Sequence, residues 1–289
     1  YKASLFSDYI GSSAAKEVTN YAAALNHGYQ LVKQHGILTN NHILEIQEIL
    51  EKNQAGFRKL PGTKIENKST GEIVHTPPQD HQQIILLMND LERFINDDDF
   101  SDIDPLVKMA IIHYQFEYIH PFYDGNGRAG RIINILYLVA KKLLDIPILY
   151  HSRHIIENKY EYYTLLKSVG NTGNWEPWIL FMLDAVHLTS IQTIYIIDEI
   201  KRIMMDYKHG IREKLTKIYS QDLINSLFKH PYTKINSLQN DLGVSRHTAT
   251  RYLRLLTNKA FLEQYKIGRN NYYVNPPLFN LLANVARPC

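Results

Sequence analysis

Residues 120–131 bring several reactive and anion-binding side chains together in one short stretch. The stretch is His-Pro-Phe-Tyr-Asp-Gly-Asn-Gly-Arg-Ala-Gly-Arg, and apolar segments with helical periodicity precede and follow it. Imidazole has an ordinary pKa near neutrality, about 6.5, so His120 is the natural general base of this stretch. Asp124 supplies a carboxylate, which is a typical ligand for Mg²⁺ beside bound phosphates.

The second half of the stretch predicts an anion site at the start of a helix. A helix start offers unpaired N–H groups and the positive end of the helix dipole. Gly125 and Gly127 would let the backbone approach a phosphate closely. Arg128 and Arg131 are three residues apart, so they share one helix face, and their guanidinium groups match phosphate oxygens. Together these residues predict transfer of a phosphate-containing group onto a hydroxyl.

Each of these features also has an ordinary structural explanation when it is taken alone. Gly-Asn-Gly is usually a turn, a histidine before proline usually ends a helix, and two arginines on one helix face are usually solvated. The ordered combination is far more specific than its parts.

The complete string resembles the signature of Fic domains, His-Pro-Phe-x-Asp/Glu-Gly-Asn-Gly-Arg-x-x-Arg, with every fixed position present. Phe116, Glu117 and Ile119, just before it, also look like residues of that family. The resemblance implies a mainly α fold, with a Fic helical core and a β-hairpin flap. It also implies an enzyme that transfers AMP from ATP to a Ser, Thr or Tyr hydroxyl of a protein, itself included.

The resemblance assigns roles residue by residue. His120 would be the catalytic base, and Asp124 would hold Mg²⁺. The nucleotide-binding residues would be Gly125, Asn126, Gly127, Arg128, Ala129, Gly130, Arg131, Tyr162 and Tyr163. The two arginines would hold the β- and γ-phosphates, and the tyrosine pair lies where Fic proteins place a residue against the adenine ring. Relatives that phosphorylate their target have Lys at the position of Gly127, so glycine there favours AMP transfer.

The resemblance also implies a flap over the active site. Short β-prone runs at 63–65 and 72–75, on either side of a polar turn, predict a hairpin whose edge could pair with a target segment.

Fic proteins that inhibit themselves from the N-terminal side carry a Ser/Thr-x-x-x-Glu-Gly/Asn motif. Its glutamate pairs with the second arginine of the signature. Counting from Ser7 reaches Gly11, and counting from Ser4 reaches Asp8, so neither count matches. Either the protein lacks this inhibitory motif, or a stretch of the chain is missing between about Ser7 and Asp8, and we favour the second explanation as a hypothesis.

Apolar periodicity predicts a helix-rich core and a second domain. Helices are expected over 18–35, 41–53, 83–96, 104–119, 128–144, 155–169, 175–188 and 190–209. Further helices over 222–228, 235–241 and 246–259, with strands over 261–265 and 271–274, resemble a winged helix-turn-helix. We therefore divide the chain into a Fic domain with an N-terminal helical extension, 1–210, and a winged helix-turn-helix domain, 211–289.

Charge suggests that the second domain contacts DNA. Residues 201–289 carry 15 Lys and Arg against 5 Asp and Glu, a net +10, whereas the remaining residues carry 17 against 24, a net −7. The side chains expected to face a major groove are Arg246, His247, Thr248, Thr250, Arg251 and Arg254, with Arg269 in the wing. Packing, dimerisation or protein contact are the alternatives for this domain.

The composition indicates which class of protein this is and in which cellular compartment we expect it. The chain has 289 residues, 45% hydrophobic and 21% charged, as in ordinary globular proteins. Its single cysteine, Cys289, cannot form an intrachain disulfide, which favours a reducing compartment and excludes a cysteine metal site. Without a long apolar run or a signal segment, we expect a cytoplasmic protein with no membrane partner, and a homodimer is an additional expectation.

Two other functions remain open from the sequence. The same site could use another phosphate-containing donor. The anion site formed by residues 125–131, here called the cradle, gives a clearer prediction of phosphate binding than of adenine binding. The chain could instead be a non-enzymatic, DNA-binding regulator that senses ATP. The first alternative predicts label transfer from a donor other than ATP, and the second predicts salt-dependent DNA binding without a covalent adduct.

Overall fold

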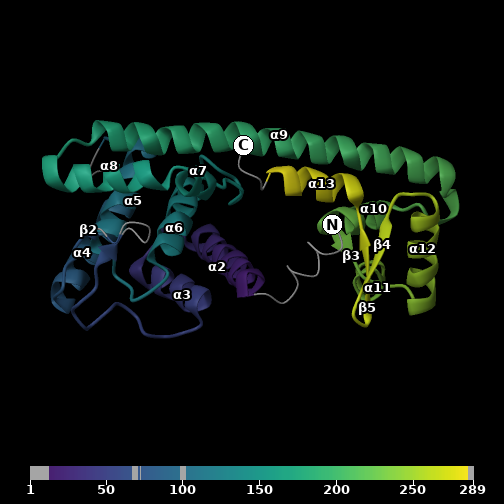
Figure 1. Ribbon diagram of the computed structural model, residues 1–289, viewed down its shortest axis with the longest axis horizontal. Coiled ribbons are helices and arrows are strands. Elements are labelled where there is room, and N and C mark those ends of the chain that lie inside the picture. Colours follow the sequence, from purple (N-terminus) through teal and green to yellow (C-terminus); the bar gives the residue numbers. More distant parts are fainter. Residues whose placement is uncertain (1–12, 67–70, 72, 98–101, 286–289) are drawn as a thin grey trace. The chain divides into compact units, whose positions relative to one another are not determined.

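The computed structural model describes residues 13–66, 71, 73–97 and 102–285. The chain divides into two compact units, one of residues 11–191 and one that includes residues 192–289 (Figure 1). The division lies inside a long helix, earlier in the chain than the domain boundary predicted at residue 210. The stretch around Ser7 and Asp8, where a missing segment was hypothesised, lies outside the described residues.

The first unit is helical, as the sequence predicts. Its helices are α2 (Ser13–His35), α3 (Asn40–Glu51), α4 (His81–Asn96), α5 (Pro105–Ile119), α6 (Asn126–Ala140), α7 (Ser152–Glu157), α8 (Lys159–Thr172) and the first part of α9 (Glu176–Lys214). Helices α5 and α6 pack against each other, and α2 packs against both α3 and α6 (Figure 1). Two short antiparallel strands, β1 (Ile65–Glu66) and β2 (Ile73–His75), form the predicted hairpin.

Helix α5 is the central element of this unit. It begins at Pro105, and the carboxylate of Asp104 accepts a hydrogen bond from the backbone N–H of Leu106 at 2.8 Å. Apolar residues surround it on almost every side, and its buried residues also include the polar His113 and Glu117. The helix ends at His120, so the core fixes the direction from which this residue enters the site.

Three helix predictions need correction. Helix α6 ends at Ala140 and not near residue 144, because Lys142 adopts a left-handed conformation with φ 58°. The predicted helix 155–169 is two helices, α7 and α8. They separate at Asn158, whose side chain donates to the carbonyl of His154 at 2.9 Å.

The two helices predicted over 175–188 and 190–209 form one helix, α9. Thr189 lies inside it, and its hydroxyl donates to the carbonyl of Ala185, one turn earlier. By length and composition alone α9 could cross a membrane, since an 18-residue window has a mean hydropathy of 1.5 and is 22% buried. Core helices of soluble proteins pass the same test, so the absence of a membrane partner stays a prediction.

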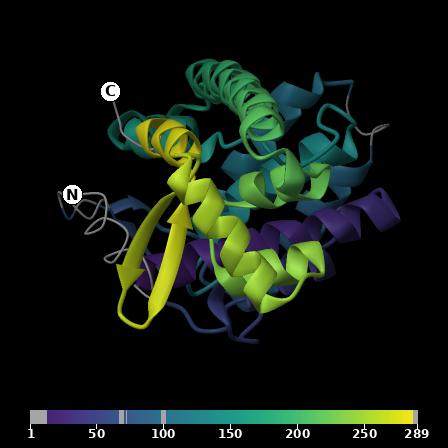
Figure 2. The ribbon, with the colours of Figure 1, turned by 90° about the vertical axis from the view of Figure 1, so that its right-hand side faces the viewer.

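The second unit has the predicted order of helices and strands. Helices α10 (Gln221–Lys229), α11 (Ile235–Leu242) and α12 (Arg246–Asn258) precede strands β4 (Glu263–Ile267) and β5 (Asn270–Val274), and α13 (Pro276–Val285) follows them. A two-residue strand, β3 (Tyr232–Thr233), completes an antiparallel sheet of order β3-β5-β4. Figure 2 shows the hairpin of β4 and β5 in yellow. Gly243, with φ 62°, ends α11, and Ser245 caps α12. Strand β3 and helix α13 were not predicted.

Candidate active site

His120 lies at the C-terminal end of α5 in a left-handed conformation, with φ 48° and ψ 59°. Its side chain is 20% exposed, and Nδ1 lies 3.7 Å from Oε2 of Glu117, one helical turn earlier. That distance suits an ion pair and is too long for a hydrogen bond. Since Nδ1 faces the carboxylate, Nε2 is the ring nitrogen that remains for a substrate hydroxyl.

Glu117 is a buried carboxylate beside His120, and only 6% of it is exposed. Burial alone would raise its pKa, but the neighbouring His120, His113 and Arg131 outweigh burial and hold the pKa below its ordinary value. The site therefore contains a fixed negative charge beneath the imidazole. The sequence indicated Glu117 only through the family resemblance.

Asn126, which was predicted to bind nucleotide, forms two hydrogen bonds within the loop between α5 and α6. The side chain of Asn126 accepts from the backbone N–H of Phe122 at 2.9 Å and donates to the Phe122 carbonyl at 2.8 Å. Gly125 follows a left-handed path with φ 81°, and a Cβ added there would lie 2.5 Å from Oε1 of Glu51. The backbone angle therefore favours glycine at position 125, and any larger residue would also displace the Glu51 carboxylate.

The structure separates the predicted nucleotide-binding residues of α6 into two groups. Gly125, Asn126, Gly127, Arg128 and Arg131 line a cavity of about 500 Å³, together with His120 and Asp124. Ala129 and Gly130, which also belong to α6, are buried. A Cβ on Gly130 would lie 2.8 Å from Oε1 of Glu117 in α5. These two residues pack the helix against α5 and do not form the pocket wall.

The two arginines of the signature have different surroundings. Arg128 pairs with Glu17 at 2.9 Å and with Glu51 at 2.8 Å, and Asp124 lies 3.7 Å away. Arg131 lines the pocket, and its buried Nε has no hydrogen-bond partner within the described part of the chain. The guanidinium of Arg128 is therefore already paired with carboxylates, whereas Arg131 stays available to an anion.

Glu17 is a site residue that the sequence analysis missed. Counting four residues from Ser13, and not from Ser4 or Ser7, reaches Glu17, so the motif Ser-x-x-x-Glu is present without an inserted stretch. Val18 follows where the family motif has Gly or Asn. The contact is with Arg128, the first arginine of the signature, and not with the second arginine that the resemblance implied.

Part of the pocket lining is apolar. Ile155, Ile156 and Leu166 line the pocket together with Tyr163, and Lys159 stands at the start of α8. The sequence did not single out the isoleucines, the leucine or the lysine, because isolated residues on three different turns carry no local motif.

Tyr162 and Tyr163 both line the pocket, and most of the Tyr162 side chain is packed in the core. Tyr162 is 6% exposed, its hydroxyl lies 3.1 Å from Nε2 of His113, and its ring packs 5.4 Å from Trp178. Tyr163 is more exposed and is the better placed of the predicted pair to meet a base.

A layer of buried polar side chains lies behind the pocket. Burial lowers the pKa of His113 to about 4 and that of His151 to about 3, so both are neutral at physiological pH. His151 lies 3.3 Å from the side-chain nitrogen of Asn134. The prediction that His113 packs in the core and is not catalytic agrees with its 1% exposure.

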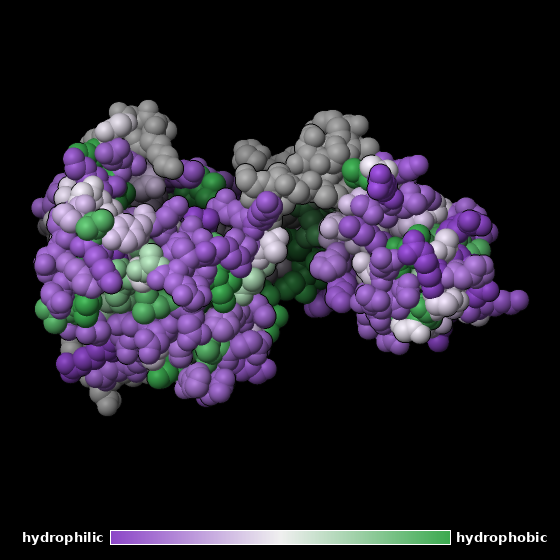
Figure 3. All heavy atoms as spheres, turned by 90° about the horizontal axis from the view of Figure 1, so that it is seen from below, coloured by the Kyte–Doolittle hydropathy of each residue, from purple (hydrophilic) through white to green (hydrophobic). Residues whose placement is uncertain are grey.

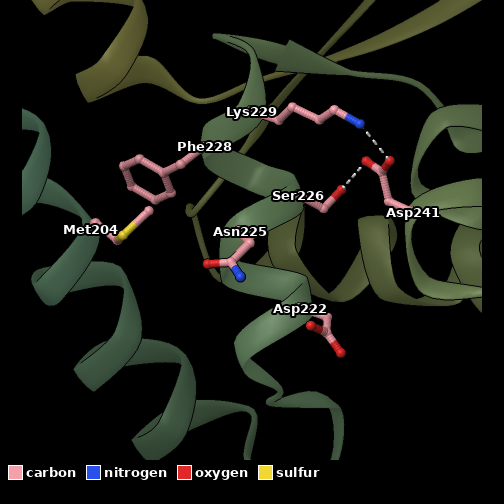
Figure 4. A pocket seen from close by; sticks show the side chains of 7 residues that line it. All are labelled: Met204, Asp222, Asn225, Ser226, Phe228, Lys229 and Asp241. Carbon is pink, nitrogen blue, oxygen red and sulfur yellow. Dashed lines mark hydrogen bonds and ion pairs between the residues drawn. The ribbon is translucent and has the colours of Figure 1, made fainter. Parts of the chain in front are cut away.

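A second hollow, of about 400 Å³, lies in the other unit (Figure 4). Two of its three charged residues pair with each other, since Asp241 accepts from Lys229 at 3.0 Å and also from the Ser226 hydroxyl at 2.8 Å. These bonds tie α10 to α11 and do not converge on the hollow. We therefore place the active site at His120.

Comparison with known proteins identifies the class. Residues 37–138 match the Fic/DOC family, and residues 203–278 match the family described as "Protein adenylyltransferase SoFic-like, C-terminal domain". The chain therefore contains a Fic/DOC domain, as the signature predicted, and a second region similar to the SoFic-like C-terminal domain, which the signature did not predict.

Individual relatives agree with this assignment. Protein adenylyltransferase Fic of Drosophila erecta and that of Drosophila melanogaster are each 32% identical over 117 residues, which is 40% of this chain. The chain spans 22% of the length of these relatives. A Fic family protein from Desulfovibrio desulfuricans G20 shares the fold, with a TM-score of 0.53 and 22% identity over 90% of this chain and 74% of that one. Fic-1 from C. elegans has a TM-score of 0.50 and 25% identity, over 65% and 54% of the two chains.

The buried histidines should make the fold lose stability in acid. In an unfolded chain histidine titrates near 6.5. Below about pH 6.5 the unfolded chain therefore binds protons that His113 and His151 exclude in the folded state. The free energy of unfolding should fall by up to about 1.4 kcal/mol per pH unit per histidine, until pH reaches each folded pKa.

Urea unfolding of wild type and His151→Gln between pH 7.5 and 4.5 would measure this effect. The variant should have the shallower pH dependence. His187→Gln, at an exposed position of α9, is the control and should keep the wild-type slope. Equal slopes for wild type and His151→Gln would contradict the prediction.

Glu17→Gln should strengthen nucleotide binding. The Glu17 carboxylate is 58% exposed and competes with phosphate for Arg128. Exposed ion pairs contribute roughly 0.2–1 kcal/mol, so the dissociation constant for ATP should fall by up to about fivefold in calorimetric titrations. Glu45→Gln, which removes an exposed pair with His27, is the matched control and should change nothing. An unchanged affinity in Glu17→Gln would show that this pair does not restrain the site.

Proposed function

We propose that this protein transfers AMP from ATP to a hydroxyl group of a protein. The observation that carries the proposal is that His120 and the arginine-lined start of α6 face the same pocket of about 500 Å³. The names of the relatives that match 40% of the chain support the same activity.

The residues of the site suit each part of this reaction. The target hydroxyl oxygen attacks the α-phosphorus, and Nε2 of His120 accepts its proton. The bond from the α-phosphorus to the bridging oxygen breaks, and pyrophosphate leaves. The unpaired N–H groups at the start of α6, with Arg128 and Arg131, hold the phosphates and stabilise the charge that develops on them. Catalysis then rests on positioning and charge stabilisation.

Asp124 fits the role of Mg²⁺ ligand. Its side chain is 80% exposed and lines the pocket, and Oδ1 accepts from the backbone N–H of Gly125 at 2.7 Å. The described residues contain no cluster of three or more potential metal ligands. Mg²⁺ commonly uses one or two carboxylates together with substrate phosphates, so a single carboxylate suits an ion that arrives with ATP and offsets phosphate charge.

The hairpin of β1 and β2 is the proposed docking edge for the target. His75 at the end of β2 lies 3.0 Å from the carbonyl of Tyr118, which ties the hairpin to the last turn of α5. A target strand paired with this hairpin would bring its hydroxyl toward His120.

His120→Ala should abolish transfer without abolishing ATP binding. Removing a positioned general base lowers rates by about 100- to 10,000-fold, whereas the cradle on α6 stays intact. Intact mass after incubation with Mg·ATP and a lysate of candidate targets would show an added AMP mass only with wild type. His187→Ala, at an exposed position, should behave as wild type. A persistent adduct in His120→Ala would exclude this histidine as the base.

The same assay addresses the alternative donor. If wild type transfers no label from ATP but does so from another nucleotide, the alternative with a different phosphate-containing donor replaces this proposal.

We also propose that the C-terminal unit binds DNA. Arg246, His247, Arg251 and Arg254 are exposed on α12, and on the face shown in Figure 3 this unit is mostly hydrophilic. Net positive charge on an exposed helix of this kind suits phosphate contact. A cytoplasmic location and a homodimer remain proposals that rest on the sequence alone.

Arg251→Ala with Arg254→Ala should weaken DNA binding and its salt dependence. The slope of log K against log salt should become shallower by about 0.9 for each phosphate that the double variant no longer neutralises, measured by fluorescence anisotropy on a duplex. Arg202→Ala is the control, because Arg202 already pairs with Glu199 and Asp206. Equal binding by the double variant and the control would favour a protein partner for this face. DNA binding without any nucleotide transfer would favour the regulator alternative.

A further inference from the structure

Arg58 is a fully buried cation in the segment between α3 and the hairpin, with 0% exposure. No carboxylate of the described residues forms an ion pair with it. Burial lowers the pKa of this guanidinium, but arginine stays protonated in proteins. A buried charge without a counter-charge is costly, so the groups that surround Arg58 must account for it.

The side chain of Arg58 donates to backbone carbonyls at the end of α5. Nε donates to the carbonyl of His120 at 2.9 Å, and Nη2 lies 3.4 Å from the carbonyl of Ile119. The last carbonyls of a helix lack partners within the helix and carry the negative end of its dipole. The end of α5 is therefore the counter-charge of Arg58.

The same guanidinium also reaches the far end of the hairpin. Nη2 donates to the carbonyl of Pro78, which follows β2. His81, the first residue of α4, bonds through Nδ1 to the carbonyl of Arg58 at 2.9 Å. Both ends of the hairpin segment, residues 58 and 78, are thus joined to the end of α5 through one side chain.

The backbone beside Arg58 adds further ties to the signature loop. The N–H of Arg58 donates to the carbonyl of Pro121 at 2.8 Å. The N–H groups of Lys59 and Leu60 donate to the hydroxyl of Tyr123 at 2.8 and 3.1 Å. The segment that enters the hairpin therefore contacts the catalytic loop on both sides of Phe122.

His120 needs such a restraint. A left-handed backbone conformation is uncommon for residues other than glycine and persists where the surroundings impose it. The Arg58 bond fixes the His120 carbonyl itself, so it acts directly on the backbone angles that aim the imidazole.

We propose that Arg58 is a positioning residue, whose guanidinium holds His120 in its left-handed conformation and sets the hairpin in register with it. Arg58 contacts no reacting atom. This inference rests on the proposed function for its effect on turnover.

Kinetics of Arg58→Met and Arg58→Lys would test the proposal. Arg58→Met should lower kcat for AMP transfer by about 100-fold, the order of loss that a 1 Å misplacement causes. The KM for ATP should stay within about twofold of wild type, because the cradle lies on α6. Arg58→Lys should also lose activity, since one ammonium group cannot reach three carbonyls with the geometry of a guanidinium.

Lys108→Met is the matched control for loss of a buried cation. Lys108 is 2% exposed, lies near the opposite end of α5 and donates to the carbonyl of Asp97 at 3.1 Å. This variant should lower the thermal midpoint but keep kcat. Arg58→Met with wild-type kcat, or with a loss no larger than that of Lys108→Met, would overturn the proposal.

Two further measurements separate this proposal from simple instability and from the proposed function. Guanidinium ion added to Arg58→Ala should restore part of kcat, whereas an alkylammonium ion should restore less, and equal restoration by both ions would overturn the proposal. Hydrogen exchange needs no turnover: amides of residues 119–124 should exchange faster in Arg58→Met than in wild type or Lys108→Met. If wild type transfers no AMP, the proposed function fails, while unchanged exchange in Arg58→Met would separately overturn the role of Arg58.

Discussion

The site depends on the close approach of the C-terminal end of α5 and the N-terminal end of α6, which carry opposite ends of the helix dipole. The carbonyl end of α5 carries His120, and the N–H end of α6 forms the anion cradle a few residues later. The side chain of Asn126, bonded to both backbone groups of Phe122, holds this short loop in one conformation. The proposed base and the proposed phosphate site therefore line one pocket because two packed helices share a short, hydrogen-bonded connection.

Charge around this junction follows from the same geometry. The buried carboxylate of Glu117 lies 3.7 Å from the imidazole of His120 and can orient it, and the charge of Arg131 helps to keep this carboxylate ionised. Arg128, on the same helix turn, faces outward to Glu17 and Glu51. Arg131 is thus available to an anion. Arg128 is paired with carboxylates that a phosphate would have to displace.

The sequence predicted the parts of the site that local spacing determines and missed those that tertiary contacts create. The signature predicted that His120, Asp124 and the start of α6 lie together because they are nearly consecutive, and the structure brings them to one pocket. Glu17 was missed by counting from the wrong serine, although the motif was present. Arg58 gave no signal, since an arginine in a loop is normally solvated, and only the fold shows that it is buried. Strand β3 is too short for any periodicity to reveal it.

The continuity of α9 gives the two units a shared element of secondary structure. Trp178 and Phe181 at its beginning belong to one hydrophobic core, and Ile203 and Tyr207 further along belong to the other. Helix formation is cooperative, and short helices alone are marginal in water. Cutting the chain between the units would leave each core with a fraying helical end. Each unit therefore includes part of a helix whose remaining turns belong to the other unit.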